Sequence, residues 1–316
     1  MSEGTDTFKS VTIHSRSAKR FLEKLDETHE RWSGGPWIFR GQNKSSWKLE
    51  PSLFRDWDEN TYSGYELSLI DRFIRSANLV NLPIPANALG YYDRSRNDGV
   101  TSTQRLLADN SGIRSGMKYD FTHVAFAIAQ HSGVPTRLLD FTYDPLVAAF
   151  FAADWTGLWE SMELSAEKLA EYFNDIFWRY QDSPEDGELA LAEYSEKVNT
   201  KLAELPKEMA VWAIRVSDLQ NTTLRVLDHP YTEILNLRSQ KGVFLCETEG
   251  YEVNGESWRS FNGNLSKLIE TGGVYKLTLP CKERDKLLEL LDKKRINALY
   301  LKPTYESVAK AVRKRP

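Results

Sequence analysis

An arginine at the end of a short apolar run is the first residue of this sequence with an evident chemical use. Residues 37–42 read Trp-Ile-Phe-Arg-Gly-Gln, so Arg40 follows Phe39 directly and precedes Gly41 and Gln42. A guanidinium group is a rigid fork of donors that matches a carboxylate or a phosphate, and glycine lets a second backbone or a ligand approach closely. Two interpretations stay open: Arg40 binds an anion, or it pairs internally with an acid such as Asp140.

A second group of polar residues lies between positions 130 and 142. It consists of Gln130, His131, Arg137, Asp140 and Thr142. The sequence predicts that a buried helix ends at the first two, that Gly133 and Pro135 turn the chain, and that a strand presents the other three. A new helix then begins at Pro145, and the amide groups at a helix N-terminus can bind an anion.

These polar residues also have structural interpretations. His131 suits the C-terminal end of its helix, and Asp140 can be the partner of Arg40 or Arg137. Asp144 directly precedes a helix and is most simply its N-cap. We predict that Arg40 and Asp140 share one buried polar network, because a buried charge needs a partner.

A third polar cluster, residues 238–241, enters the apolar run 242–247. The run is typical of a buried strand, and a short helix is predicted before it, over 232–237. Gln240 can therefore aim its amide into a cleft, or it can cap that helix.

The elements that must position these groups follow from hydrophobic spacing. Short apolar runs predict strands, at 11–14, 37–39, 137–141, 209–216, 242–247, 274–279 and 299–301. Helical spacing predicts further helices, at 17–30, 65–80, 121–130, 145–155, 282–293 and 305–314. Strands and helices do not alternate regularly, which favours an α+β fold with a mixed or largely antiparallel central sheet and surrounding helices.

Charge and turn residues suggest how the chain is divided. Residues 31–250 are predicted to form the main domain, with 1–30 packing on it as a strand and a helix, and with 251–316 extending it by a strand and helices. Residues 156–207 are charged and have helical spacing, so we interpret them as a surface insertion. The turn-rich stretch 81–117 is predicted to be a long loop.

Composition narrows the function classes. Of 316 residues, 41% are hydrophobic and 27% charged, which is enough for a large core. The net charge of -4 gives no global basic field, so nucleic acid is not indicated as a partner. The two cysteines lack ligand spacing, so no metal is predicted. With no signal peptide and no membrane-length apolar run, we expect a cytoplasmic protein; the oligomeric state stays open.

Several blocks of the sequence resemble the FRG domain family, which is named after its Phe-Arg-Gly triplet. The matching blocks are Phe39–Gln42, Glu50–Arg55, Ala129–His131, Pro135–Thr142, Asp144–Leu146, Phe150–Ala152 and the spacing Arg238-x-Gln240-x-Gly242-x-Phe244. The blocks follow one another in the family's order. The resemblance implies a bacterial or phage-related protein and, in some contexts, a role in anti-phage defence.

A weaker resemblance is to the arginine-type ADP-ribosyltransferases, whose fold it implies. Their first motif is an aromatic-Arg-Gly at a strand end, and their second is a Ser/Thr-bearing strand that leads into a small-residue helix, as after Thr142. Their third is a catalytic glutamate near a later strand, for which Glu247 is the first choice and Glu233 the second. Here no Glu-x-Glu precedes that strand.

This second resemblance implies NAD as the cofactor, with the pyrophosphate held by Arg40. It assigns catalytic roles to Arg40, Glu247 and Glu233, and cofactor contacts to Phe39, Gly41, Gln42, His131, Arg137, Asp140, Thr142 and Gln240.

Three functions therefore compete. The first is an NAD-dependent ADP-ribosyltransferase-like enzyme, or an NAD glycohydrolase, in anti-phage defence. The second is a non-catalytic sensor that binds a nucleotide or a protein, which the missing Glu-x-Glu favours. The third is a metal-dependent nuclease that uses Asp140, Asp144 and Asp154. A structure can distinguish these hypotheses by showing whether Arg40, Thr142 and a carboxylate lie together in one pocket.

Overall fold

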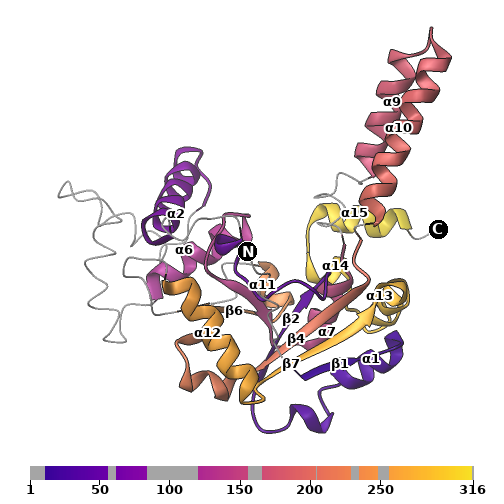
Figure 1. The fold of residues 1–316 in the computed structure, drawn as a ribbon. Helices are drawn as coiled ribbons and strands as arrows, with labels where there is room; N and C mark the ends of the chain where they lie inside the picture. The colour runs from indigo at the N-terminus through magenta and orange to yellow at the C-terminus, as the bar shows by residue number, and fades with distance from the viewer. Residues whose placement is uncertain are drawn as a thin grey trace, which may run out of the picture.

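A seven-stranded sheet forms the centre of the molecule (Figure 1). The computed structural model describes residues 11–55, 62–83, 120–155, 166–203, 205–228, 235–247 and 256–314. Its strands are β1 (Val11–His14), β2 (Trp37–Gln42), β3 (Leu139–Thr142), β4 (Glu208–Arg215), β5 (Leu224–Leu227), β6 (Gly242–Glu247) and β7 (Val274–Pro280). They lie in the order β1-β7-β4-β2-β3-β6-β5.

The strand directions confirm the predicted fold class. Strands β1 and β7 pair in parallel, whereas the other five neighbouring pairs are antiparallel. The sheet is therefore mixed and largely antiparallel, and the fold is α+β. Strands β2 and β3, which carry Arg40 and Thr142, are neighbours at the centre of the sheet.

Helices surround this sheet. They are α1 (Ala18–Leu25), α2 (Tyr62–Leu79), α6 (Asp120–His131), α7 (Pro145–Ala153), α9 (Ala166–Arg179), α10 (Pro184–Ala203), α11 (Leu235–Ser239), α12 (Glu256–Glu270), α13 (Arg284–Asp292), α14 (Ala298–Leu301) and α15 (Tyr305–Lys314). Short 3₁₀ turns occupy Glu30–Trp32, Ser52–Phe54, Val216–Asn221 and Cys281–Glu283.

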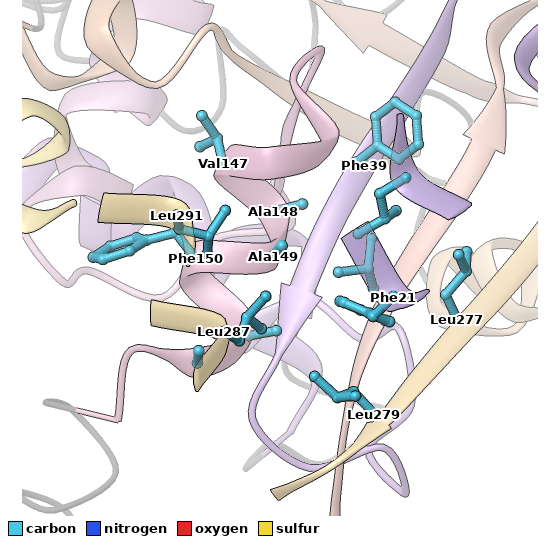
Figure 2. Packing of buried hydrophobic residues seen from close by; sticks show 14 of the residues in the cluster. Phe21, Phe39, Val147, Ala148, Ala149, Phe150, Leu277, Leu279, Leu287 and Leu291 are labelled. Carbon is cyan, nitrogen blue, oxygen red and sulfur yellow. The ribbon is translucent and has the colours of Figure 1, made fainter. Parts of the chain in front are cut away.

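Helix α7 packs directly on strand β2 and forms the middle of the largest core cluster. Figure 2 shows Val147, Ala148, Ala149 and Phe150 of α7 among side chains of α1, α13, β2 and β7. The alanines keep the helix close to the strand. A Cβ atom added to Gly41 would overlap the carbonyl oxygen of Ala148. Glycine is therefore required at this position because a helix backbone occupies the space of its side chain.

Two further clusters complete the core. On the opposite face of the sheet from α7, Ile38, Phe141 and Ile214 pack under α12, which contributes Leu265, Leu268 and Ile269. Beyond β3, helices α2 and α6 pack against Phe244 and Cys246 of β6. Helix α7 is buried on nearly all sides, whereas α12 is held on the sheet by one stripe of apolar side chains.

A hairpin of two helices, α9 and α10, projects away from the sheet (Figure 1). It occupies the charged stretch for which the sequence predicts a helical surface insertion. The ring of Tyr172 stacks on that of Tyr194, with centroids 3.6 Å apart, and Ile176 is buried between the helices. The division of the chain into a main domain, an insertion and a C-terminal extension stays a prediction.

Some predicted elements differ from the structure. Residues 299–301 belong to helix α14, so the strand predicted there is wrong. The side chain of Asn297 accepts a hydrogen bond from the amide of Tyr300 and caps this helix. Helix α1 ends at Leu25, earlier than predicted, since Asp26 adopts an extended conformation and binds the amide of Thr28. Strand β5 and helix α12 were not predicted at all.

Other expectations are only partly covered by the structure. The predicted loop 81–117 lies outside the described residues after residue 83, as do residues 232–234 of the helix predicted at 232–237; residues 235–239 form α11. Within the described ranges, no helix is both long and apolar enough to cross a bilayer.

Candidate functional site

Arg40 bridges two neighbouring strands where their pairing stops. Strand β2 pairs with β4 at all six of its residues but with β3 only at Phe39 and Thr142. The Nη1 group of Arg40 donates to the carbonyl oxygen of Asp140, at 2.7 Å. The side chain thus satisfies a strand carbonyl that has no partner in the ladder between β2 and β3.

The pair formed by Arg40 and Asp140 is open to solvent on one side. The Arg40 Nη1 atom lies 3.5 Å from the Asp140 carboxylate, and the exposed fractions of the two side chains are 16% and 59%. Burial lowers the pKa of Arg40, and the charge of Asp140 opposes that shift, so the guanidinium is charged at neutral pH. The two residues share a network as predicted, but the network is only partly buried.

The Nε group of Arg40 is buried and has no hydrogen-bond partner. Buried donors are nearly always paired in folded proteins, and those left unpaired deserve a functional or structural explanation. The positive charge of Arg55 also acts on Arg40 and adds to the lowering of its pKa by burial. Arg55 is itself held by the carbonyl of Glu50.

A chain of hydrogen bonds links Asp140 to the 3₁₀ turn at residues 52–54. The Gln130 amide donates to the Asp140 carboxylate at 3.2 Å, and its oxygen accepts the Thr136 hydroxyl at 2.5 Å. The amide nitrogen of Thr136 donates to the Ser52 hydroxyl at 3.3 Å. Three separate sequence blocks therefore meet around Arg40, which explains why polar residues are concentrated in them.

Arg137 forms a second ion pair, which is buried on all sides and which we call the sealed pair. Its Nε group lies 2.5 Å from the Glu66 carboxylate, and its backbone amide donates to the other oxygen of Glu66 at 2.7 Å. The exposed fractions of these side chains are 2% and 0%. The pair holds α2 against the start of β3. Sequence reading assigned Arg137 to a cofactor and missed Glu66, since nothing local marks an acid 71 residues away as its partner.

Thr142 and Gln240 fix the start of helix α7. The Thr142 hydroxyl donates to the backbone oxygen of Gln240 at 2.6 Å and accepts the amide of Asp144 at 3.0 Å. The side-chain amide of Gln240 donates to the carbonyl of Leu301 at 2.8 Å. These polar groups are thus engaged in holding β3, β6 and α14 together around the N-terminus of α7.

The two acids at the ends of α7 have structural partners as well. Asp144 is the N-cap of α7 and pairs with Lys241 at 2.9 Å. Asp154 follows the last turn and pairs with Lys302 at 2.5 Å. A nine-residue helix, about 13 Å long, lies between these two residues. In the part of the chain that the structure describes, no group of three potential ligands could hold a metal ion.

The remaining residues predicted to contact a cofactor are dispersed. Phe39 belongs to the core beneath α7, and Gly41 contacts that helix. Gln42 is buried, donating to the carbonyl of Lys48 and accepting the indole NH of Trp212 at 2.7 Å. His131 is exposed at the end of α6.

Within the described residues, no predicted catalytic glutamate lies beside Arg40. Glu247 is completely buried at the end of β6, where its carboxylate accepts the amide of Asn264 from α12 at 3.1 Å. It pairs in register with Leu224 on the edge strand β5. Glu233 lies outside the described residues.

Comparison with family models bears on these blocks directly. The model of the FRG domain matches residues 35–156. The chain contains an FRG domain. The matched range covers β2, the 3₁₀ turn at 52–54, α6, β3 and α7, which are the elements that meet at Arg40. Searches of curated proteins and of solved structures each find no match.

The structure gives each residue of the FRG triplet a distinct role. Phe39 fills the core, Arg40 bridges β2 to β3, and Gly41 admits helix α7. The first and third are packing roles. Arg40 alone presents charged atoms next to an exposed side chain, so it is the member of the triplet that can meet a ligand.

Proposed function

We propose that this FRG domain binds a nucleotide at the open pair of Arg40 and Asp140 and does not turn it over. One observation carries the proposal. Arg40 has a buried Nε donor without a partner, and its guanidinium lies beside a carboxylate that is 59% exposed. A mostly buried charged donor therefore lies beside a charged acceptor that faces solvent.

This pair suits the two polar parts of a nucleotide. Phosphate oxygens accept from guanidinium groups in bidentate geometry, and the nearby charge of Arg55 acts on the same place. The Asp140 carboxylate can accept ribose hydroxyl groups, with Gln130 holding it in position. The ADP-ribosyltransferase resemblance makes NAD the first ligand to test.

Binding without turnover is favoured by the position of the glutamate. Cleavage of the nicotinamide bond needs a carboxylate aimed at the ribose, where positive charge develops. Glu247 is buried under α12 and engaged by Asn264. Gln240, whose amide cannot supply a negative charge, is engaged by Leu301.

NAD-dependent ADP-ribosyl transfer or NAD hydrolysis is the second candidate. The adjacency of β2 and β3 at the sheet centre favours it, because the Arg40 and Thr142 motifs then lie on neighbouring strands. In such an enzyme Asp140, which touches Arg40, would be the carboxylate next to the ligand. A role in anti-phage defence, as the family resemblance implies, fits either candidate.

The test is isothermal titration calorimetry with NAD, ADP-ribose and ADP, run alongside a measurement of NAD consumption. We expect binding by the wild type and a loss of about 10-fold in affinity for Arg40→Lys, since the point charge remains but the fork is lost. Asp140→Asn should weaken the ribose-containing ligands. Arg215→Lys, at a separate surface pair with Asp218, is the matched control and should bind normally.

The outcomes separate the two candidates. Binding without NAD consumption supports the binding module, and NAD consumption abolished by Asp140→Asn supports the enzyme. If the folded protein binds none of the three ligands, the nucleotide proposal is wrong.

A further inference from the structure

We infer that the α9–α10 hairpin is a dimerisation element that pairs with the hairpin of a second copy of this chain. The hairpin stands apart from the sheet, and each of its helices packs mainly on the other (Figure 1). Several of its large apolar side chains face solvent. These are Phe173, Phe177, Trp178, Leu189, Leu191 and Leu202.

Four of these residues lie on one face of the hairpin. The helices meet along Tyr172, Ile176 and Tyr194. Advancing 100° per residue from that contact line places Phe173 and Phe177 on one flank of α9. Because α10 runs in the opposite direction, the same rule places Leu191 and Leu202 on the same flank of the hairpin. We call these four residues the apolar stripe.

Charge is concentrated on the other flank. The ion pair of Asp175 and Arg179 lies there on α9, and Glu193 and Lys197 lie there on α10. Most of the charge named here is therefore on the flank opposite the apolar stripe, whereas Glu188 lies on the same flank as the stripe. Two antiparallel helices have no third layer of their own to cover the apolar stripe, whereas two hairpins together make a four-helix bundle.

The size of the flank agrees with a dimer. Helices of 14 and 20 residues are about 21 and 30 Å long and about 10 Å wide. One flank therefore offers about 500 Å², and two flanks bury about 1,000 Å², the lower bound for a specific interface. A two-fold axis would bring the same stripe of each copy together.

The test measures the mass of the full chain by light scattering from low to high micromolar concentration. We expect twice 36.3 kDa for the wild type and a single-chain mass for Phe177→Arg. Leu189→Arg is the matched control, since Leu189 is similarly exposed, at 65% against 64% for Phe177, but the advance of 100° per residue places it away from the stripe. It should remain dimeric, and circular dichroism should show that both variants fold.

Three results would overturn the inference. A wild type that is a monomer at every concentration would mean that the stripe is exposed or is covered by another molecule. A dimer that survives Phe177→Arg uses a different surface. Equal disruption by both variants would mean that the interface does not follow the apolar stripe.

Discussion

The two arginine–acid pairs of the FRG domain differ in how far they are sealed. Arg137 and Glu66 are almost completely buried, and Glu66 meets both the side chain and the backbone of its partner. Arg40 contacts Asp140 through a single guanidinium nitrogen, Nη1, and the Asp140 side chain is mostly exposed. Both pairs stand beside β3, so the contrast comes from what covers them rather than from their place in the fold.

The difference separates a structural pair from a binding pair. A sealed pair is out of reach of solvent and cannot exchange its partner for a ligand without leaving a buried charge unpaired. An open pair can add a ligand while keeping its internal contact. Residue type alone does not distinguish the two, because both consist of an arginine and an acid near a strand.

The largest effect is expected from breaking the sealed pair. Glu66→Ala leaves the Arg137 charge buried without its partner and should cost about 3–5 kcal/mol of unfolding free energy. Asp140→Ala should cost less than about 1 kcal/mol, as for an exposed ion pair. Urea denaturation measures both. Equal losses would mean that the two pairs do not differ as described.

Gly41→Ala should destabilise the packing of helix α7 on β2, the strand that carries Arg40. The added methyl group would overlap the backbone of α7, so we expect a loss of about 1–3 kcal/mol or more. Gly263→Ala is the control, since its Cβ would meet open space in helix α12 and should stabilise the helix slightly. Thermal unfolding compares them. A neutral Gly41→Ala would contradict the close contact of α7 with β2.

Arg40→Ala should have a smaller effect on stability than on ligand binding. It removes one bond to a strand carbonyl and leaves that oxygen unpaired, which costs about 1–3 kcal/mol. Arg40→Lys should recover part of this loss in urea denaturation but not the affinity for a nucleotide. A lysine variant with wild-type affinity would show that the fork of Arg40 is not used.

The smallest expected effect is on the pH dependence of stability. It concerns Cys246, a buried thiol on which the charges of Arg137 and Glu66 act. Burial raises the pKa of its thiol to about 12, with the charge of Glu66 adding to the shift. Since the unfolded thiol ionises near its ordinary value of 9.0, its contribution to stability is complete below that pH and is lost between 9 and 12. The difference in unfolding free energy between Cys246→Ala and the wild type should therefore be smaller at high pH than at pH 8. A constant difference in urea midpoints would contradict this.

Sequence reasoning predicted the centre of the fold because its signals are local. The apolar run before Arg40 and the alanines after Pro145 each specify one element, and the dense polar block between 130 and 142 indicated that side chains meet there. The contact of Arg40 with Asp140 was predicted on this basis. Gly41 also behaves as predicted for a close backbone approach.

The misses come from contacts between distant parts of the chain. Glu66 lies far from Arg137 in sequence, although it stands four residues before the buried Ile70 of α2, and this helical spacing is the signal that could have shown that its carboxylate faces inward. The role predicted for Glu247 depends on what covers β6, and the helix that covers it, α12, was not predicted. Its Leu265, Leu268 and Ile269 do have helical spacing, which is the signal that could have revealed it.

The most direct test of the account follows the Nε–H signals of arginines by NMR in the ¹⁵N-labelled protein. Arg40→Lys identifies the Arg40 signal by its disappearance. On titration with ADP-ribose we predict that this signal shifts, because its Nε donor is unpartnered, whereas the signals of sealed arginines such as Arg137 stay in place. An Arg40 signal that stays fixed at saturating ADP-ribose would contradict the central claim.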